Sequence, residues 1–436
     1  MNIPFTRHAL GNGLSVIVHE DHNCPIVALN VWYHVGSKNE VPKRTGFAHL
    51  FEHLMFEGSE HYDRGYFHPL QEAGAALNGS TNADRTNYWE VVPSNALDLA
   101  LWMESDRMGY LLPALTDAKF SNQRDVVLNE RRQNYENRPY GLAGMAIVAA
   151  LYPADHPYHW LTIGEADDIR AAHIDDVRAF FQRYYHPGNA SLALAGDIDA
   201  ATGVALAERY FAEIPGGEKP GDVIVTKPDA PVEDVRLVLE DRVELPRLYL
   251  AWHSPGLFAD GDAELDLVGE VLSSGKTSRL YRSLVYEQRI ATEVAASQNS
   301  RELGSFFQIV ATAAPGRTLA EVERAISKEI AGVIDRGPTE AELERCLAQA
   351  ESHFLFRLQT VGGFGGKSDQ LNAYNTFLGD PGYFEKDLER YRSATTLQLR
   401  TAAARWLKPD RRVVLSVVPR GRLGLALAGS QPVTVS

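Results

Sequence analysis

The segment GFAHLFEHLM, residues 46–55, carries the strongest indication of fold and chemistry in this chain. Its polar residues His49, Glu52 and His53 form the pattern H-x-x-E-H, which reverses the commoner metal motif H-E-x-x-H. This spacing predicts an amphipathic helix whose polar stripe lies between strongly apolar flanks. The apolar side chains recur at helical spacing, at Phe47, Leu50, Phe51, Leu54 and Met55.

Residues four apart lie about 40° from each other around a helix axis, so His49 and His53 share one face. Their imidazoles can converge on one tetrahedral Zn²⁺, which leaves positions for a third ligand and a water. Glu52 lies one turn from His49, and its carboxylate can reach that water as a general base. The motif therefore predicts a zinc hydrolase. A solvated helix face with incidental histidines is the alternative.

A third ligand must come from elsewhere in the chain, and the helical segment 122–132 (NQRDVVLNERR) is acidic enough to supply one. We expect residues 126–128 to pack inward, and Glu130, beside them, is placed so that it can turn into a site. Arg131 and Arg132 are expected to stay in water. Spacing alone does not choose among the acids that could be the ligand, which are Glu57, Glu60, Asp125, Glu130 and Glu136.

The motif H-x-x-E-H followed by VVLNERR resembles the pitrilysin/insulinase family of zinc metallopeptidases, and in particular the zinc-bearing, beta-type subunit of the mitochondrial processing peptidase. The resemblance implies one Zn²⁺ per chain, with Glu130 as the third ligand. Where many relatives carry an additional glutamate, this chain has Gln123. Residues 77–82 (LNGSTN), with Thr86 and Tyr88, resemble the strand on which the family holds a substrate backbone. The implied substrate-binding residues are Asn78, Gly79, Ser80, Thr81 and Asn82.

A helix, an aromatic closing turn, a proline and an apolar strand occur twice, 222 residues apart. Residues 177–187 precede an expected strand at 190–195, and residues 399–409 precede one at 412–418. The duplication predicts two related halves. Further expected strands are 14–18, 26–33, 78–93, 236–239 and 247–252, and residues 95–137 are expected to be largely helical.

Between the halves, residues 215–222 (PGGEKPGD) form a linker by composition. We therefore predict an α+β fold of two homologous domains, each a mostly antiparallel sheet packed with helices. The zinc-binding catalytic domain would be 1–221, and 222–436 would be a degenerate copy. The resemblance implies the same duplicated, processing-peptidase-like architecture.

The predicted second domain carries no metal motif. At the repeat offset, the four metal-site residues correspond to Val271, Ser274, Gly275 and Ser352, none of which can perform zinc chemistry. Residues 274–277 and 362–368 imitate phosphate loops, but both lack the first glycine of a Walker A motif. The second segment is favoured as a flexible turn, and the alternative is a mobile glycine-rich loop near the cleft, which some relatives use for substrate handling.

The composition, with 44% hydrophobic and 23% charged residues, is that of an ordinary globular protein. A net charge of −14 disfavours nucleic acid or an anionic membrane as partner. Cys24 and Cys346 imply no disulfide framework. The first residues lack an apolar signal core, and no window approaches the roughly 18 apolar residues of a membrane span. We expect a cytoplasmic protein, or a periplasmic one if a signal peptide has been removed.

These features predict a zinc-dependent endopeptidase that cleaves peptides or unfolded segments in an enclosed cleft, with Glu52 as general base on a zinc-bound water. In single-chain relatives the second half supplies an arginine and a tyrosine for the oxyanion. Leu284 and Ala291 occupy those positions here, and Arg282, Tyr286 and Arg289 are out of register.

The resemblance therefore implies a heterodimer, in which a homologous subunit lacks the zinc motif and carries the arginine–tyrosine pair. A homodimer is an alternative. The competing function is a non-catalytic core or peptide-binding subunit of a larger complex. The lyase S-ribosylhomocysteinase also carries H-x-x-E-H, but it is far shorter and uses a cysteine ligand, which this chain lacks near the motif.

Overall fold

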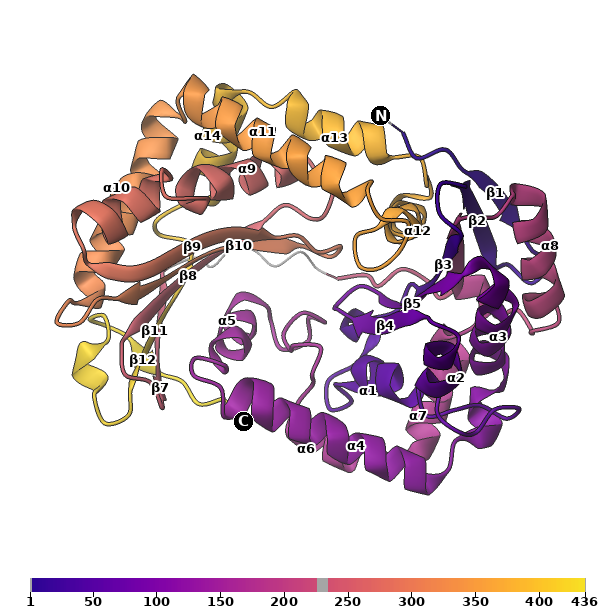
Figure 1. Cartoon of the computed structure of the whole chain (residues 1–436). Coiled ribbons are helices and arrows are strands. Elements are labelled where there is room, and N and C mark those ends of the chain that lie inside the picture. The colour runs from indigo at the N-terminus through magenta and orange to yellow at the C-terminus, as the bar shows by residue number, and fades with distance from the viewer. Residues whose placement is uncertain (1, 226–233, 436) are drawn as a thin grey trace. The chain divides into compact units, whose positions relative to one another are not determined.

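The structure, a computed structural model, describes residues 2–225 and 234–435. The contacts within it divide the chain into two compact units, neither of which is continuous in sequence. Each unit is built around one six-stranded sheet (Figure 1). Unit 1 contains Met1–Asn129, Thr162–Val223 and His353–Lys386, and unit 2 contains Glu130–Leu161, Ile224–Ser352 and Asp387–Ser436.

The sheet of unit 1 has the strand order β1-β2-β6-β3-β5-β4. β2 and β6 run parallel, whereas the other neighbouring strands of this sheet are antiparallel. The central strand β3 is an apolar run that is buried almost throughout, because both faces of the sheet are covered. The strands are β1 (Thr6–Ala9), β2 (Ser15–Glu20), β3 (Ile26–Tyr33), β4 (Ala76–Thr81), β5 (Thr86–Pro93) and β6 (Ala190–Gly196).

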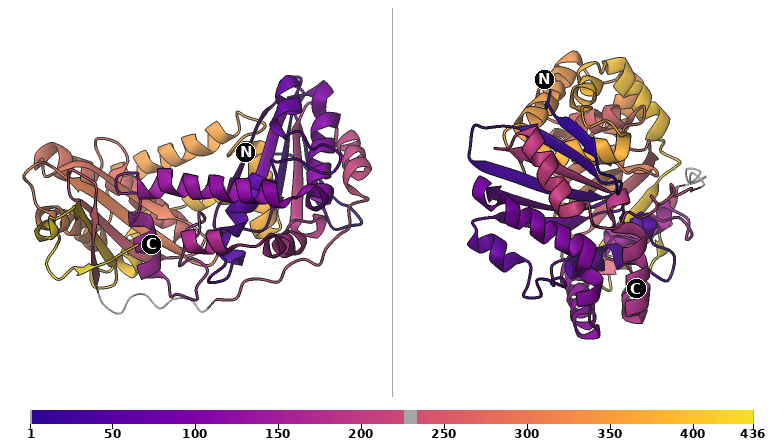
Figure 2. Two further views of the ribbon diagram at one scale, coloured as in Figure 1. Left: turned by 90° about the horizontal axis from the view of Figure 1, so that it is seen from below. Right: turned by 90° about the vertical axis from the view of Figure 1, so that its right-hand side faces the viewer.

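Helices lie on both faces of this sheet, as Figure 2 shows from two further directions. α12 (Lys367–Leu378) covers the face that carries Asn30 and Ser191; the Ser191 hydroxyl donates to Asn372 Oδ1 of α12 at 2.7 Å. The opposite face packs against α1, α3 and α8. The helices from this part of the chain are α1 (Phe47–Leu54), α2 (Phe67–Glu72), α3 (Leu97–Ala114), α4 (Asp117–Arg131), α6 (Ala166–Ala171), α7 (Ile174–Tyr184) and α8 (Ala200–Phe211).

The sheet of unit 2 has the order β12-β7-β11-β8-β10-β9, with β7 parallel to both β11 and β12. Its core joins buried residues of β8 and β10 with those of α9, α10 and α14. The strands are β7 (Val235–Asp241), β8 (Arg247–Ser254), β9 (Ala291–Asn299), β10 (Ser305–Ala313), β11 (Val413–Pro419) and β12 (Gln431–Pro432). The remaining helices are α5 (Ala143–Leu151), α9 (Asp262–Ser273), α10 (Leu319–Arg336), α11 (Glu340–Arg357), α13 (Phe384–Arg392) and α14 (Thr396–Trp406).

Five strands of each sheet share one topology, and the sixth differs, because β1 is antiparallel to β2 whereas β12 is parallel to β7. β2-β6-β3-β5-β4 in unit 1 corresponds to β7-β11-β8-β10-β9 in unit 2, including the one parallel pair. α7 and α14 begin and end 222 residues apart, as the sequence repeat predicts. The predicted α+β class with two sheet-and-helix halves is confirmed, and each sheet is mixed.

Each unit takes one helix from the other half of the sequence. α12 follows the second repeat's long helices, yet it packs on β6 and β3 of unit 1. α5 follows the first repeat's long helices, yet it packs on β11 and β8 of unit 2. The predicted boundary between residues 221 and 222 describes the repeat in the sequence and remains a prediction for the folding units.

The expected helical stretch 95–137 is confirmed as α3, α4 and the turn Arg132–Glu136, with a break at residues 115–116. Two local expectations were wrong. Val126 is 38% exposed, so only Val127 of that apolar run is fully buried. Arg131 is buried, because its guanidinium pairs with Glu136 and lies against Met145. Among the described residues no helix is both long and apolar enough to cross a membrane.

Candidate metal centre

The motif helix α1 is anchored at its first turn by a buried glutamate. The two carboxylate oxygens of Glu40, which is 6% exposed, accept the backbone N–H groups of Gly46 and Ala48, each at 2.9 Å. These N–H groups have no partner inside the helix, and negative charge is favoured at this end. Sequence reasoning missed Glu40. Its one signal was an acid a few residues before an expected helix start.

Glycine is required where α1 begins. Gly46 has a φ of 86°, in the left-handed region. A Cβ there would lie 3.0 Å from the carbonyl oxygen of Ile163. On the buried side of α1, Phe51 stacks on Phe180 and lies against Tyr185, so the aromatic face of α7 fixes the helix rotation. The apolar stripe predicted from sequence is buried, at Phe47, Leu50, Phe51, Leu54 and Met55.

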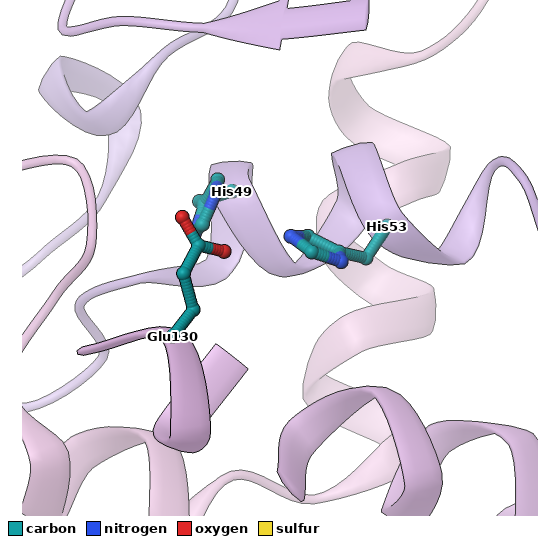
Figure 3. Close-up of side chains that lie close together, drawn as sticks. All are labelled: His49, His53 and Glu130. Carbon is teal, nitrogen blue, oxygen red and sulfur yellow. The ribbon is translucent and has the colours of Figure 1, made fainter. Parts of the chain in front are cut away.

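The other stripe of α1 carries the motif. His49 and His53 are half-buried, and their rings lie 4.9 Å apart at right angles. Glu130, in the last turn of α4, directs its carboxylate towards them (Figure 3). One ligand atom from each of the three side chains lies within 4.8 Å of the other two. Glu52 is half-buried in the same turn of α1 as His53.

This donor set fits zinc. Two imidazole nitrogens and one carboxylate oxygen are a known set of three protein ligands that leaves the fourth position open. Ligand atoms around a tetrahedral Zn²⁺ lie roughly 3.4 Å apart, given bonds of about 2.1 Å. Small side-chain rotations would bring the three groups to that spacing. In the described parts of the chain, no second group of three such residues meets the same distance limit.

The Glu130 carboxylate is held by a residue just beyond the end of its own helix. The amide nitrogen of Asn134 donates to Glu130 Oε1 at 3.3 Å. Asn134 lies in a π-helical turn, Arg132–Glu136, that continues α4. Such turns occur often at functional sites. Burial, and next the charge of Glu130, raise the pKa of Tyr135 in the same turn.

The other four third-ligand candidates lie outside this group. The carboxylate of Glu57 accepts the side-chain amide of Gln123, and Glu136 pairs with Arg131. Glu60 and Asp125 are exposed. Gln123 therefore has a defined contact here: it donates to an acid, where a second carboxylate would meet like charge.

The predicted substrate strand is an edge strand. β4 is last in its sheet and pairs with β5 alone among the described strands. The Asn82 N–H donates to the Arg85 carbonyl at 3.0 Å, so residues 82 and 85 form a bonded pair. Bonded and non-bonded pairs alternate along an antiparallel ladder. The N–H and C=O groups of Leu77, Gly79 and Thr81 therefore point to the open edge.

The five predicted substrate-binding residues have different surroundings. Gly79 lies so close to Phe56 and Tyr88 that a Cβ would meet their rings at 3.1 and 3.0 Å. Its N–H donates to Asn78 Oδ1 at 2.8 Å. Ser80 faces the opposite side and donates to Asn87 Oδ1 at 2.7 Å. Asn82 lies beyond β4, in the hairpin turn, where its Oδ1 accepts the Asp84 N–H at 2.7 Å.

Comparison with known families matches both halves of the chain. Residues 15–156 match the insulinase family (peptidase family M16), and residues 172–350 match the peptidase M16 inactive domain. The zinc protease PqqE of Helicobacter pylori is 28% identical over 388 residues, covering 87% of this chain and 86% of the relative. An uncharacterized zinc protease of Mycobacterium leprae is 28% identical over 346 residues, covering 77% and 75%.

Solved structures share the fold. A protease from H. pylori superposes with a TM-score of 0.87 at 24% identity, covering 96% of this chain and all of that one. The first half of the periplasmic protease PqqL from Escherichia coli gives 0.77 at 18% identity, covering 97% and 94%. The two family matches, the relatives and the shared fold agree. The chain belongs to the insulinase family of zinc proteases, peptidase family M16.

Proposed function

We propose that this chain is a zinc-dependent endopeptidase that cleaves peptides or unfolded segments. The observation that carries the proposal is the convergence of His49, His53 and Glu130 from two helices. The relatives named zinc proteases support the choice of metal. The open edge of β4 supports a peptide substrate, because an extended chain can add to it through backbone hydrogen bonds.

The three ligands would hold one Zn²⁺ per chain. When bound, Zn²⁺ supplies a Lewis acid that acidifies water and polarises a peptide carbonyl. Glu52 would take a proton from the attacking water onto its carboxylate and pass it to the leaving amine. Asn78 to Thr81 in β4 would hold the peptide extended, and the Asn78 side chain would release the Gly79 N–H to it. Affinity would then depend little on sequence at the paired positions.

The variant Glu52→Gln tests this assignment. It removes the proton acceptor and keeps the shape, so peptide turnover should fall by at least about 100-fold. Zinc content, measured by atomic absorption, should stay at that of the parent. Turnover near the parent rate would reject Glu52 as the base. Absence of turnover and of bound zinc in the parent chain would favour the alternative, a non-catalytic core or peptide-binding subunit.

We also propose that full activity needs a second subunit. The positions where single-chain relatives carry the arginine and tyrosine hold Leu284 and Ala291, which are buried at 0% and 4% exposure. The neighbouring Arg282 is paired with Glu287. The proposed partner is a homologous chain with the arginine–tyrosine pair and no zinc motif, as in a processing-peptidase heterodimer. A homodimer is the alternative.

The test is the rate of peptide cleavage by the purified chain before and after addition of such a homologue. Oxyanion stabilisation is worth about 100- to 1000-fold in turnover, so activity should rise on that scale. Full specific activity from a monomer, with the mass measured by light scattering, would reject this division of labour. Full activity from a dimer of identical chains would establish the homodimer instead.

We propose a cytoplasmic location for the protein. The E. coli relative is described as a periplasmic protease, which makes the periplasm the alternative. Fractionation of cells that express the gene from its native start would decide between them.

A further inference from the structure

Unit 1 contains a cavity of about 630 Å³ that the proposed chemistry does not use. It lies between the β4 end of the sheet and residues 358–363, which lead into α12. Its size falls in the range of ligand pockets. The apolar side chains that line it are Ile26, Ala76, Trp89, Val91, Leu358 and Val361.

The cavity is on the α12 face of the sheet, opposite the metal motif. Ala76 pairs with Val91 across β4 and β5, and Asn78 pairs with Trp89. Paired residues share a face, and alternate residues face opposite ways. Gly79 is therefore on the other face, where it meets Phe56, which follows α1. The cavity and the metal motif thus lie on the two sides of the same edge strand.

The segment that roofs the cavity is built for close packing. A Cβ on Gly362 would lie 2.5 Å from Ala28 Cβ and 2.6 Å from Val91 Cγ2. The N–H groups of Lys367 and Ser368 donate to the carbonyls of Thr360 and Val361, each at 3.0 Å. The roof is therefore a fixed wall.

Charge at the cavity is already neutralised. The Lys367 ammonium lies 2.6 Å from Asp21 Oδ2, and the Lys367 hydrogen bond lowers the pKa of Asp21 to about 2. This pair leaves little attraction for a charged ligand. The indole N–H of Trp89 is buried and has no acceptor in the described parts of the chain. The Trp89 ring meets the Phe364 ring edge-on, with 5.5 Å between centroids, so this part of the wall is aromatic and suits an apolar group.

We propose that this cavity is a specificity pocket for a large apolar side chain of a peptide that lies along β4. The inference rests on the proposed peptidase function. In a peptide added to β4, side chains alternate between the two faces of the sheet. One set would face the metal motif, and the other set would face the cavity beside Ala76. Substrates would then be selected for a large apolar residue at the one position that lies beside Ala76.

Cys24 provides a probe, because it lines the cavity and is exposed. The other cysteine, Cys346, is buried, and burial raises its pKa to about 11, so a maleimide reacts with it slowly. The experiment measures alkylation of Cys24 by pyrene maleimide in zinc-loaded Glu52→Gln, which binds peptide without cleaving it. Two extended peptides are compared, identical except that every second residue is leucine in one and serine in the other.

The leucine peptide at saturation should slow alkylation by about tenfold, because its side chain fills the cavity that Cys24 lines and blocks the maleimide, and the serine peptide should not. Cys24→Ser must show no fast labelling. In the active chain, pyrene on Cys24 should raise KM for the leucine peptide by about tenfold, with kcat changed less. The Cys24→Ser chain treated in the same way should keep the parent KM.

Equal protection by both peptides, or by neither, would overturn the proposal. So would an unchanged KM after labelling. These outcomes are distinct from failure of the proposed function, because protection is measured without turnover. Protection by the leucine peptide in a chain that never cleaves peptide would support the pocket and reject the peptidase function. Cleavage of both peptides at equal rates would leave the peptidase and reject the pocket.

Discussion

Removal of the Glu40 carboxylate should loosen the helix that carries the metal motif. Its two oxygens accept the N–H groups of Gly46 and Ala48 at 2.9 Å, in a position that is 6% exposed. A hydrogen bond to a charged group contributes about 1.5–3 kcal/mol, and unmade buried donors cost about as much. We therefore expect Glu40→Ala to lower the free energy of unfolding by about 3–5 kcal/mol. Glu40→Gln, which keeps one acceptor, should lower it by about 2–3 kcal/mol.

The effect should reach the metal, because His49 lies in the first turn of this helix and His53 in the last. Residues that orient metal ligands are worth about 10- to 100-fold in metal affinity. Zinc affinity measured by chelator competition should fall on this scale in Glu40→Gln, together with the urea midpoint. Glu218→Gln, at an exposed glutamate of the linker, is the matched control.

The interpretation fails if Glu40→Gln and Glu218→Gln have the same urea midpoint and the same zinc affinity. A lower midpoint with unchanged zinc affinity would limit Glu40 to a stabilising role. Glu40→Asp separates charge from reach: it keeps the charge but is one methylene shorter, so it should lie between the parent and Glu40→Gln.

Glu130→Gln should weaken zinc binding by at least about 100-fold, because a lost ligand costs more than a lost residue that only orients a ligand. Glu136→Gln, in the adjacent turn, is the control and should retain the metal in the same chelator assay. Burial, and next the charge of Glu104, raise the pKa of Glu90 well above its ordinary value. As pH rises, the unfolded chain loses this proton before the folded chain does. The free energy of unfolding should therefore fall above about pH 4.5, by up to about 1.4 kcal/mol per pH unit. Urea unfolding of Glu90→Gln at several pH values should show a weaker dependence of this free energy on pH. Gly362→Ala should cost about 1–3 kcal/mol of unfolding free energy, since its Cβ would overlap Ala28, while Gly424→Ala, with open space, should be neutral.

Local patterns were enough to place the secondary structure around the site. β3 and β8 begin at the residues expected from their apolar runs, and α7 and α14 repeat at the offset read from the sequence. The histidine pair also needed only helical spacing, because both ligands lie on one short helix. Selecting Glu130 from five acids required the family resemblance, since spacing along the chain does not fix which helices meet.

What sequence reasoning missed depends on tertiary contacts. A periodic pattern predicts which face of a helix is buried, but not which sheet that face packs on. The exchange of α5 and α12 between the two sheets was therefore not predicted. The burial of Arg131 was missed for a similar reason: its charge is compensated by Glu136, five residues later in the π-helical turn. Glu40 accepts helix N–H groups from a position several residues before the helix, whereas the capping rules concern the residues at the helix end itself.

Both exchanged helices bury apolar side chains, but α12 adds a set of polar contacts that bears on the site. α5 presents the apolar residues Met145, Ile147 and Val148 to unit 2, and apolar burial is not directional. α12 docks on unit 1 through Asp369, whose Oδ1 accepts from Asn30 at 3.3 Å and Trp32 at 2.9 Å of β3.

The same oxygen of Asp369 accepts from Asn87 of β5 at 3.1 Å, and its other oxygen accepts the Gly365 N–H at 2.8 Å. Four hydrogen bonds to one carboxylate specify one alignment, because every bond depends on direction. They therefore fix α12 and the roof of the cavity against β5, the strand that carries β4. None of the second-half residues that correspond to the metal motif is a ligand type. That half nevertheless supplies the helix that aligns the sheet on which the substrate edge is built.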